Sequence, residues 1–185
     1  NRAILNLGGI ANLTCLPADT GKPVIGFGIG PGNTLLDQWI ARHRNERYDR
    51  DGRWAESGKL SRALLETLLS DPYFAKLPPK STGREHFHLA WLEARLAGAG
   101  PPAPADVQAT LSELTARSIS EAILGALPGV NEIYLCGGGV HNRDLVARLA
   151  RALPGRPVRS TAELGLDPDW VEAAAFAWLA WQTLH

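Results

Sequence analysis

The chain has 185 residues, 45% of them hydrophobic and 21% charged, and its 19 basic and 19 acidic side chains give a formal net charge of zero. This length and composition suit one globular domain that can bury a core of its own. The neutral balance, the lack of any Lys/Arg run and the lack of an apolar run of roughly 18 residues lead us to expect neither nucleic acid nor a membrane as a partner.

The first residues of the chain are predicted to form strands. Two apolar runs, Ala3–Leu7 and Ile10–Leu16, are separated by Gly8-Gly9, which is a pattern typical of a β-hairpin. A polar turn follows, and Pro23–Phe27 is a third candidate strand.

Helices are predicted for the middle of the chain, where apolar residues recur at helical spacing. The first helix follows the turn Gly30–Asn33, with Asn33 or Thr34 as its N-cap, and the longest begins with Asp106 as its cap. A charged stretch that contains Asp51-Gly52 is predicted to be a surface loop. The predicted elements are helices over 34–43, 60–69, 87–96 and 106–127, the surface loop over 44–56 and a connector over 98–104.

The last third of the chain is predicted to alternate between strands and helices. Glu132–Cys136 is an apolar strand that leads through three glycines into an amphipathic helix, and Val158–Ser160 is a short final strand. The last helix, Trp170–Leu184, starts after Asp167-Pro168 and is apolar on almost all sides, so we expect it to be buried. The element order βββαααααβαβα indicates an α/β domain with a mixed sheet.

Three glycine-rich turns each follow a short apolar run: Asn6–Asn12, Gly28–Asn33 and Cys136–Gly139. Glycine permits positive φ and allows an anion to approach backbone N–H groups without meeting a Cβ atom. Two of the turns open a predicted helix, where backbone N–H groups favour phosphate. The three turns together predict a surface that holds the phosphates and sugar of a nucleotide.

Each turn also has a purely structural interpretation. Gly8-Gly9 can serve an ordinary hairpin, but Asn6 and Asn12 beside it carry amides that need polar partners within apolar strands, which favours phosphate contact. Gly137–Gly139 can serve tight packing of strand on helix, whereas the His141-Asn142 pair that follows favours ribose or adenine.

Three charged residues are candidates for binding substrate. Glu172 is a lone acid on an apolar helix; it either favours the positive helix N-terminus or contacts a sugar hydroxyl. Lys80 and Arg84 flank Ser81-Thr82-Gly83 after two prolines, and they either decorate a solvated loop or belong to an ordered loop that touches substrate or another lobe.

Cysteine and histidine usage argues against disulfides and bound metal. Cys15 and Cys136 have no paired spacing, which indicates reduced thiols in the cytoplasm. His86 and His88 have no partners at metal-ligand spacing, so we expect no protein metal site.

Five segments in this order resemble the anhydro-N-acetylmuramic acid kinase family, which belongs to the sugar kinase/actin/hexokinase superfamily. They extend over nearly the whole chain: Asn6–Thr14, Gly30–Asn33, Pro79–Glu85, Asp106–Leu111 and Asp169–Ala180. The resemblance implies an α/β lobe of the ribonuclease-H-like, actin-like ATPase type, with a mixed sheet and helices on both faces.

The resemblance covers only the C-terminal half of that enzyme. Residues 1–185 are therefore expected to be a single C-terminal lobe, with the N-terminal lobe as a missing partner. The sequence contains no methionine and opens directly on a strand, which agrees with the interpretation of a fragment. The family's base aspartate and first phosphate loop lie in the other half, so we expect no catalytic residue in this chain.

The resemblance further implies an ATP-dependent, cytoplasmic homodimer of peptidoglycan recycling and amino sugar metabolism. The family opens 1,6-anhydro-N-acetylmuramic acid with water and phosphorylates O6, giving N-acetylmuramic acid 6-phosphate. Mg²⁺ is expected to be held mainly through ATP. Substrate contacts are expected from Glu172, Lys80 and Arg84. The residues expected to bind ATP are Asn6, Gly8, Gly9, Asn12, Gly30, Gly32, Asn33, Gly137, Gly138, Gly139, His141 and Asn142.

One departure from the family pattern keeps two alternatives open. Gly28-Ile29 stands where the family usually has Asp-Thr, which removes a carboxylate and a hydroxyl near the expected cleft. The alternatives are a non-catalytic nucleotide-binding clamp or sensor of the same fold, and a kinase for a different carbohydrate.

Overall fold

β1 (Arg2–Leu7) lies at the centre of a five-stranded mixed sheet in the computed structural model, which describes residues 1–97 and 102–184. β2 (Ile10–Leu16) pairs with it antiparallel, and β3 (Ile25–Pro31) pairs antiparallel with β2. On the other side, β4 (Glu132–Cys136) and β5 (Val158–Ser160) continue the sheet in parallel, in the order β3-β2-β1-β4-β5. The predicted hairpin and mixed sheet are both confirmed.

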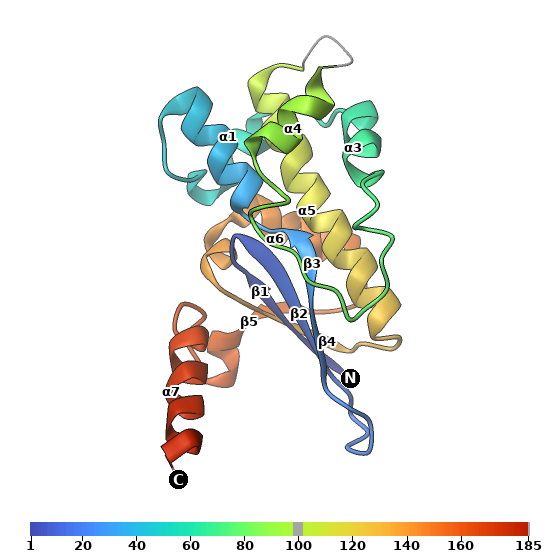
Figure 1. Ribbon diagram of the computed structural model, residues 1–185, viewed down its shortest axis with the longest axis vertical. Coiled ribbons are helices and arrows are strands. Elements are labelled where there is room, and N and C mark those ends of the chain that lie inside the picture. Colours follow the sequence, from blue (N-terminus) through green and yellow to red (C-terminus); the bar gives the residue numbers. More distant parts are fainter. Residues whose placement is uncertain (98–101, 185) are drawn as a thin grey trace.

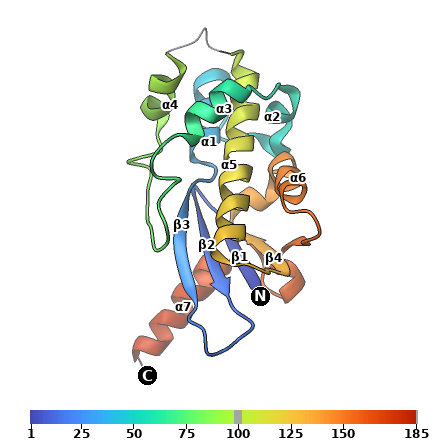
Figure 2. The same ribbon diagram turned by 90° about the vertical axis from the view of Figure 1, so that its right-hand side faces the viewer.

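Helices complete the predicted order, with five of them between β3 and β4. In Figures 1 and 2 the helices α1 to α4 surround one end of α5, and the other end of α5 lies against the sheet. Residues 98–101 of the predicted connector lie outside the described residues. The helices are α1 (Thr34–Arg44), α2 (Arg53–Ser57), α3 (Arg62–Leu69), α4 (Leu89–Leu96), α5 (Pro104–Ala126), α6 (Arg143–Ala152) and α7 (Val171–Leu184), with short 3₁₀ helices at Arg50–Gly52, Gly138–His141 and Thr161–Leu164.

Two apolar clusters hold these elements together. Alternate residues of β1, such as Leu5 and Leu7, point to the face of the sheet that α5 and α6 cover, where they pack with Ile119 and Leu145. The second cluster joins α1 to α4 to the N-terminal half of α5, around side chains such as Phe87. Each fully buried Leu or Phe side chain contributes about 1.5–3 kcal/mol.

The surface loop predicted over 44–56 is wrong. Asp49 is buried, and its carboxylate accepts hydrogen bonds from the N–H groups of Trp54 and Ala55, both at 2.9 Å. These bonds start α2, which packs against α5. Charged composition concealed the apolar residues that this short helix buries.

The predicted cap of the long helix is also wrong. α5 begins at Pro104, and Asp106 lies in its first turn, where its carboxylate accepts a hydrogen bond from the N–H of Lys59 at 2.7 Å. Asp106 therefore fixes the start of α3 against α5 rather than capping its own helix.

The expectation that α7 is buried is wrong in this chain. None of its residues is buried, and Phe176 and Trp178 are 70% and 59% exposed. Figure 1 shows α7 extending away from the rest of the fold, on the opposite side from α5. An apolar helix needs a covering surface, and no described element supplies one.

The three glycine turns meet at one end of the sheet. The backbone N–H groups of Gly32 and Thr34 donate to the carbonyl of Gly9, and that of Asn33 donates to the carbonyl of Gly8, at 2.9–3.0 Å. A Cβ atom on Gly32 would overlap the Gly8 carbonyl oxygen, and one on Gly139 would lie 2.6 Å from the Leu7 Cβ atom. The turns pack at distances that only glycine permits.

Gly32→Ala should therefore destabilise the fold by about 1–3 kcal/mol, because backbone atoms must move apart to admit the methyl group. Gly125→Ala is the matched control: Gly125 lies in α5 with no atom within 4 Å of its Cβ position, and alanine there should stabilise the helix by about 0.5–1 kcal/mol. Urea unfolding of both variants measures the effects, and equal midpoints would contradict the packing argument.

Candidate functional site

Two cavities flank Gly138, which lines both of them. The first, the hairpin pocket, has a volume of about 420 Å³ and is lined by Asn6, Gly8, Gly9, Ile10, Asn12, Arg84, Gly137, Gly138, Asp169 and Glu172. The second, the α1 pocket, has a volume of about 680 Å³ and is lined by Asn33, Leu36, Asp37, Tyr48, Asp49, Arg50, Asp51, Gly138, Gly139, His141 and Asn142. The shared glycine makes the two cavities adjacent parts of one surface.

The hairpin pocket brings the first turn together with the start of α7. The Asn6 amide donates to Glu172 Oε1 at 3.4 Å across 166 residues of sequence. Glu172 is exposed rather than buried as the sequence predicted, but the structure does place it beside the glycine turns. Its negative charge, after burial as the larger cause, raises the pKa of the neighbouring Cys136 thiol to about 11.

Gly137 fixes the connection between β4 and α7. It has φ of +80°, and its N–H donates to the carbonyl of Pro168 at 2.8 Å. The next residue, Asp169, accepts a hydrogen bond from His141 Nε2 at 3.0 Å. The hydrogen bond between Asp169 and His141 therefore joins a residue that lines the hairpin pocket to one that lines the α1 pocket.

The second glycine turn has a packing role. The N–H groups of Gly32 and Asn33 are occupied by the hairpin carbonyls, and a Cβ atom on Gly30 would meet the Phe74 ring at 2.8 Å. Asn33 also donates its side-chain amide to the Leu7 carbonyl at 3.1 Å. Of this turn, only Asn33 lines one of the two pockets.

The structure separates the two basic candidates. Arg84 lines the hairpin pocket, whereas the ammonium of Lys80 donates to the carbonyls of Tyr73 and Phe74 at 3.2 and 3.3 Å. Burial lowers the pKa of Lys80, and the nearby Lys76 adds to that effect. Lys80 therefore holds its own loop and lies apart from both pockets.

Sequence reasoning missed the acids of the α1 pocket. Asp37 lies on α1, and burial raises its pKa to about 6 although the charge of Arg84 acts in the opposite direction. Asp49 and Asp51 belong to the segment assigned to a surface loop. The sequence did contain a signal for Asp37, namely a carboxylate between the apolar residues Leu36 and Trp39, which are buried. Burying a charge costs free energy unless it is paired or hydrogen-bonded, so a carboxylate at such a position suggests a functional role.

Asp37 predicts a pH-dependent stability. Because its folded pKa of about 6 lies above its ordinary value of 3.8, the folded chain binds more protons than the unfolded chain between these values. Its contribution to the free energy of unfolding therefore falls as pH rises from about 4 to about 6.

Asp37→Asn removes that fall, so the variant should gain stability over the wild type as pH rises. Thermal unfolding of both proteins across this interval measures the difference, with Glu66→Gln on the exposed side of α3 as control. A stability difference that does not change with pH would contradict the raised pKa.

Among the described residues, no helix combines the length and apolar character needed to cross a membrane.

Two solved structures share the fold. The activator of the 2-hydroxyisocaproyl-CoA dehydratase from Clostridium difficile, solved with bound ADPNP, superposes with a TM-score of 0.56 at 15% identity, over 92% of this chain and 56% of that one. Component A of the Acidaminococcus fermentans (R)-2-hydroxyglutaryl-CoA dehydratase gives 0.52 at 15% identity, over 85% and 54%. The actin-like ATPase fold predicted from the sequence is confirmed.

Sequence comparison identifies the family. The family model for anhydro-N-acetylmuramic acid kinase matches residues 1–185. The enzyme of that name from Xylella fastidiosa is 55% identical, over 100% of this chain and 48% of its own length. The Chromohalobacter salexigens enzyme is 54% identical, over 98% of this chain and 50% of its own length. The chain thus spans about half the length of these curated relatives, and it belongs to the anhydro-N-acetylmuramic acid kinase family.

Proposed function

We propose that this chain is the C-terminal lobe of an ATP-dependent kinase that opens 1,6-anhydro-N-acetylmuramic acid with water and phosphorylates O6. The observation that carries the proposal is the convergence of Asn6–Asn12, Gly137–Gly139 and Glu172 around one pair of adjoining pockets. The proposed process belongs to peptidoglycan recycling in the cytoplasm.

In this proposal ATP lies across Gly138, with its phosphates in the hairpin pocket and its nucleoside in the α1 pocket. Gly8 and Gly9 leave room for phosphate oxygens, and His141 and Asn142 line the larger cavity, which can hold a ribose and a base. The fold relative from Clostridium difficile was solved with an ATP analogue, which supports nucleotide use.

Mg²⁺ belongs to the nucleotide in this proposal. Within residues 1–97 and 102–184, no three His, Cys, Asp or Glu side chains gather closely enough to form a metal site. The phosphate oxygens would supply most of the ligands, and Asp169 and Glu172, which line the hairpin pocket, would be the protein carboxylates on that side of the nucleotide. The ion would neutralise charge on the transferred phosphoryl group.

Glu172 is proposed to orient the sugar. Its carboxylate accepts from Asn6, and it stands beside the glycine turn where the terminal phosphoryl group would lie. Breaking the C1–O6 ether frees an oxygen that takes the phosphoryl group, so the sugar must lie in line with it. The carboxylate that activates the water is assigned to the N-terminal lobe.

The exposure of helix α7 supports the proposal that a second lobe covers it. Trp170, Phe176, Trp178 and Leu179 are each more than half exposed, which is unusual for contiguous large apolar residues in a soluble domain. We assign this surface to contact with the N-terminal lobe; a second copy in a homodimer is the other occupant to be tested.

The departure at residues 28 and 29 favours one alternative, a non-catalytic nucleotide clamp. Ile29 is 1% exposed in the core, and Gly28 pairs with Asn12 near the hairpin pocket. The Gly28 carbonyl accepts from the Tyr73 hydroxyl at 2.8 Å, so this position is integrated into the fold without a carboxylate.

The chain alone should be inactive and should bind ATP only weakly, because it supplies part of the phosphate contacts. Each charge-assisted hydrogen bond that it lacks is worth roughly 1.5–3 kcal/mol, so a few of them amount to several decades of affinity. A coupled assay measures the activity of this chain, and calorimetry measures its affinity for ATP, each with and without the N-terminal half. Sedimentation of the chain alone shows whether the exposed surface of α7 leads to self-association, and sedimentation with the N-terminal half shows whether the two lobes bind one another. Sugar phosphorylation by the chain alone would disprove the lobe assignment, and ATP binding by the two-lobe protein without sugar phosphate would favour the clamp.

Glu172→Gln in the two-lobe protein should lower turnover of the anhydro sugar about 10- to 100-fold, because a charged hydrogen bond to the sugar is lost. Affinity for ATP should change less than threefold. Glu163→Gln, an exposed acid paired with Arg159, is the control and should leave kinetics unchanged. A lower melting temperature with normal sugar kinetics would make Glu172 a structural residue.

A further inference from the structure

The segment between α3 and α4 runs along the edge strand β3 before it reaches α4 (Figures 1 and 2). Its backbone is tied to Gly28, whose N–H donates to the Lys80 carbonyl at 2.9 Å and whose carbonyl accepts from the Tyr73 hydroxyl at 2.8 Å. A few residues further along this ordered path, Arg84 reaches the pocket.

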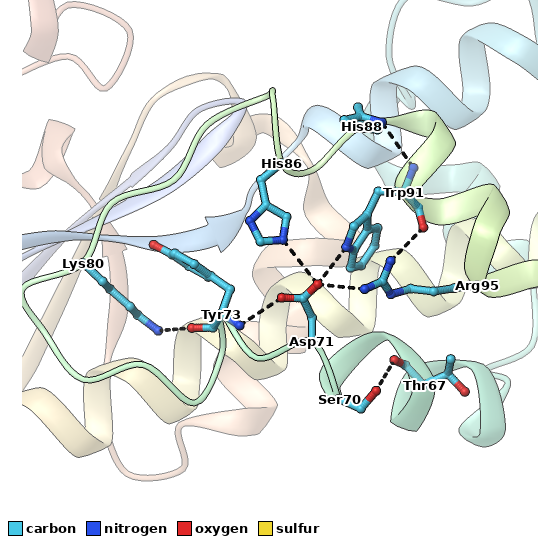
Figure 3. Close-up of polar contacts among 9 residues, drawn as sticks. All are labelled: Thr67, Ser70, Asp71, Tyr73, Lys80, His86, His88, Trp91 and Arg95. Atoms are coloured by element: carbon cyan, nitrogen blue, oxygen red, sulfur yellow. Dashed lines mark hydrogen bonds and ion pairs between the residues drawn. The ribbon is translucent and has the colours of Figure 1, made fainter.

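A buried carboxylate anchors both ends of this segment. Asp71 is 6% exposed, and its Oδ2 atom lies 2.9 Å from the indole nitrogen of Trp91, 2.8 Å from the Arg95 guanidinium and 3.2 Å from His86 Nε2, while Oδ1 accepts from the Tyr73 N–H at 2.9 Å (Figure 3). These hydrogen bonds outweigh burial and lower the pKa of Asp71. One charged group therefore joins the start of the segment, its end and α4.

The guanidinium of Arg84 lies on the backbone of the first glycine turn. A Cβ atom on Gly9 would be 3.0 Å from its Nη2 atom, so a side chain at that position would displace it. Among the described residues, the guanidinium has no hydrogen-bond or ion-pair partner, and its charge acts on Asp37 only at longer range. Its planar array of N–H donors is free to bind a ligand.

The charges around the hairpin pocket indicate what that ligand is. Asp169 and Glu172 line the pocket together with Arg84, and within residues 1–97 and 102–184 no other basic side chain does so. An anion that entered without Arg84 would meet two carboxylates and no cation. The guanidinium is therefore the group that makes the pocket acceptable to an oxyanion, which it can grip through two parallel hydrogen bonds.

We propose that Arg84 binds an oxyanion in the hairpin pocket and that Asp71 is the positioning residue that holds Arg84 over the Gly8-Gly9 turn. This inference rests on the proposed function and names one subsite within it. The oxyanion is either the terminal phosphoryl group of the nucleotide or the carboxylate of the lactyl ether on the sugar.

Arg84→Gln in the two-lobe protein tests the first part. The variant should lose about 100-fold in kcat/KM, and Arg84→Lys should recover only part of it, since an ammonium does not offer the paired donors. Arg117→Gln on α5, an exposed arginine paired with Glu121, is the matched control. Values within twofold of the wild type for Arg84→Gln would overturn the proposal.

The sugar used in the assay distinguishes the two sources of the oxyanion. 1,6-Anhydro-N-acetylglucosamine lacks the lactyl carboxylate. If Arg84 binds that carboxylate, the loss disappears with this neutral sugar; if Arg84 binds the phosphoryl group, the loss persists with both sugars.

Calorimetry keeps the test independent of turnover. If the wild-type protein phosphorylates neither sugar, the proposed function is contradicted. The Arg84 subsite can still be tested in that case, by measuring the binding of ATP, ADP and N-acetylmuramic acid to the wild type and to Arg84→Gln. Preference for ATP over ADP, or affinity for N-acetylmuramic acid, should fall at least tenfold in the variant. Unchanged binding of all three ligands would overturn the proposal.

Asp71→Asn tests the positioning role. It should reproduce the kinetic pattern of Arg84→Gln at about 10-fold, and combining the two changes should add little to Arg84→Gln alone, because both act on one interaction. Additive losses would assign Asp71 to stability only. Should Asp71→Asn fail to fold, Trp91→Phe removes one donor to the carboxylate and keeps an aromatic side chain; it should show the same pattern at about threefold.

Discussion

Close backbone contact between glycine turns is the constraint on which this fold depends. The carbonyls of Gly8 and Gly9 accept the N–H groups that begin α1, so the hairpin and the helix fix one another. Gly139 approaches Leu7 in the same way from β4. A side chain at Gly32 or Gly139 would force these segments apart. The pockets on either side of Gly138 are lined by residues of these segments.

The two pockets differ in chemical character, and in the proposed function they receive the two ends of a nucleotide. The lining of the hairpin pocket includes the Arg84 guanidinium beside the carboxylates of Asp169 and Glu172. The lining of the α1 pocket adds Leu36 and the rings of Tyr48 and His141 to the side chains of Asp37, Asp49, Arg50 and Asp51. Glu172 and Asp169 come from the segment that opens α7. Any contact that moves α7 therefore also moves the acids at the site.

Local patterns were enough to predict the strands, the hairpin and the convergence of the glycine turns, because β-pairing and close approach leave direct signals in the sequence. Contacts between distant residues were not predictable in this way. Asp49 organises α2 through backbone bonds that its charged surroundings conceal, and Lys80 and Arg84 look alike in sequence but point to different places. The apolar character of α7 predicted burial, which is wrong for this chain, because no described element covers the helix.

The central position of β1 has a consequence for synthesis of the chain. β1, β2 and β3 can pair as soon as they emerge, but the other edge of β1 must wait for β4, with Asn6 pairing opposite Cys136 about 130 residues later. At roughly 5–20 residues per second this interval lasts roughly 6 to 26 s. Throughout it, an open strand edge with Ala3, Leu5 and Leu7 on one face is available to neighbouring nascent chains. Aggregation during translation, rather than instability of the finished fold, is the hazard that this topology creates.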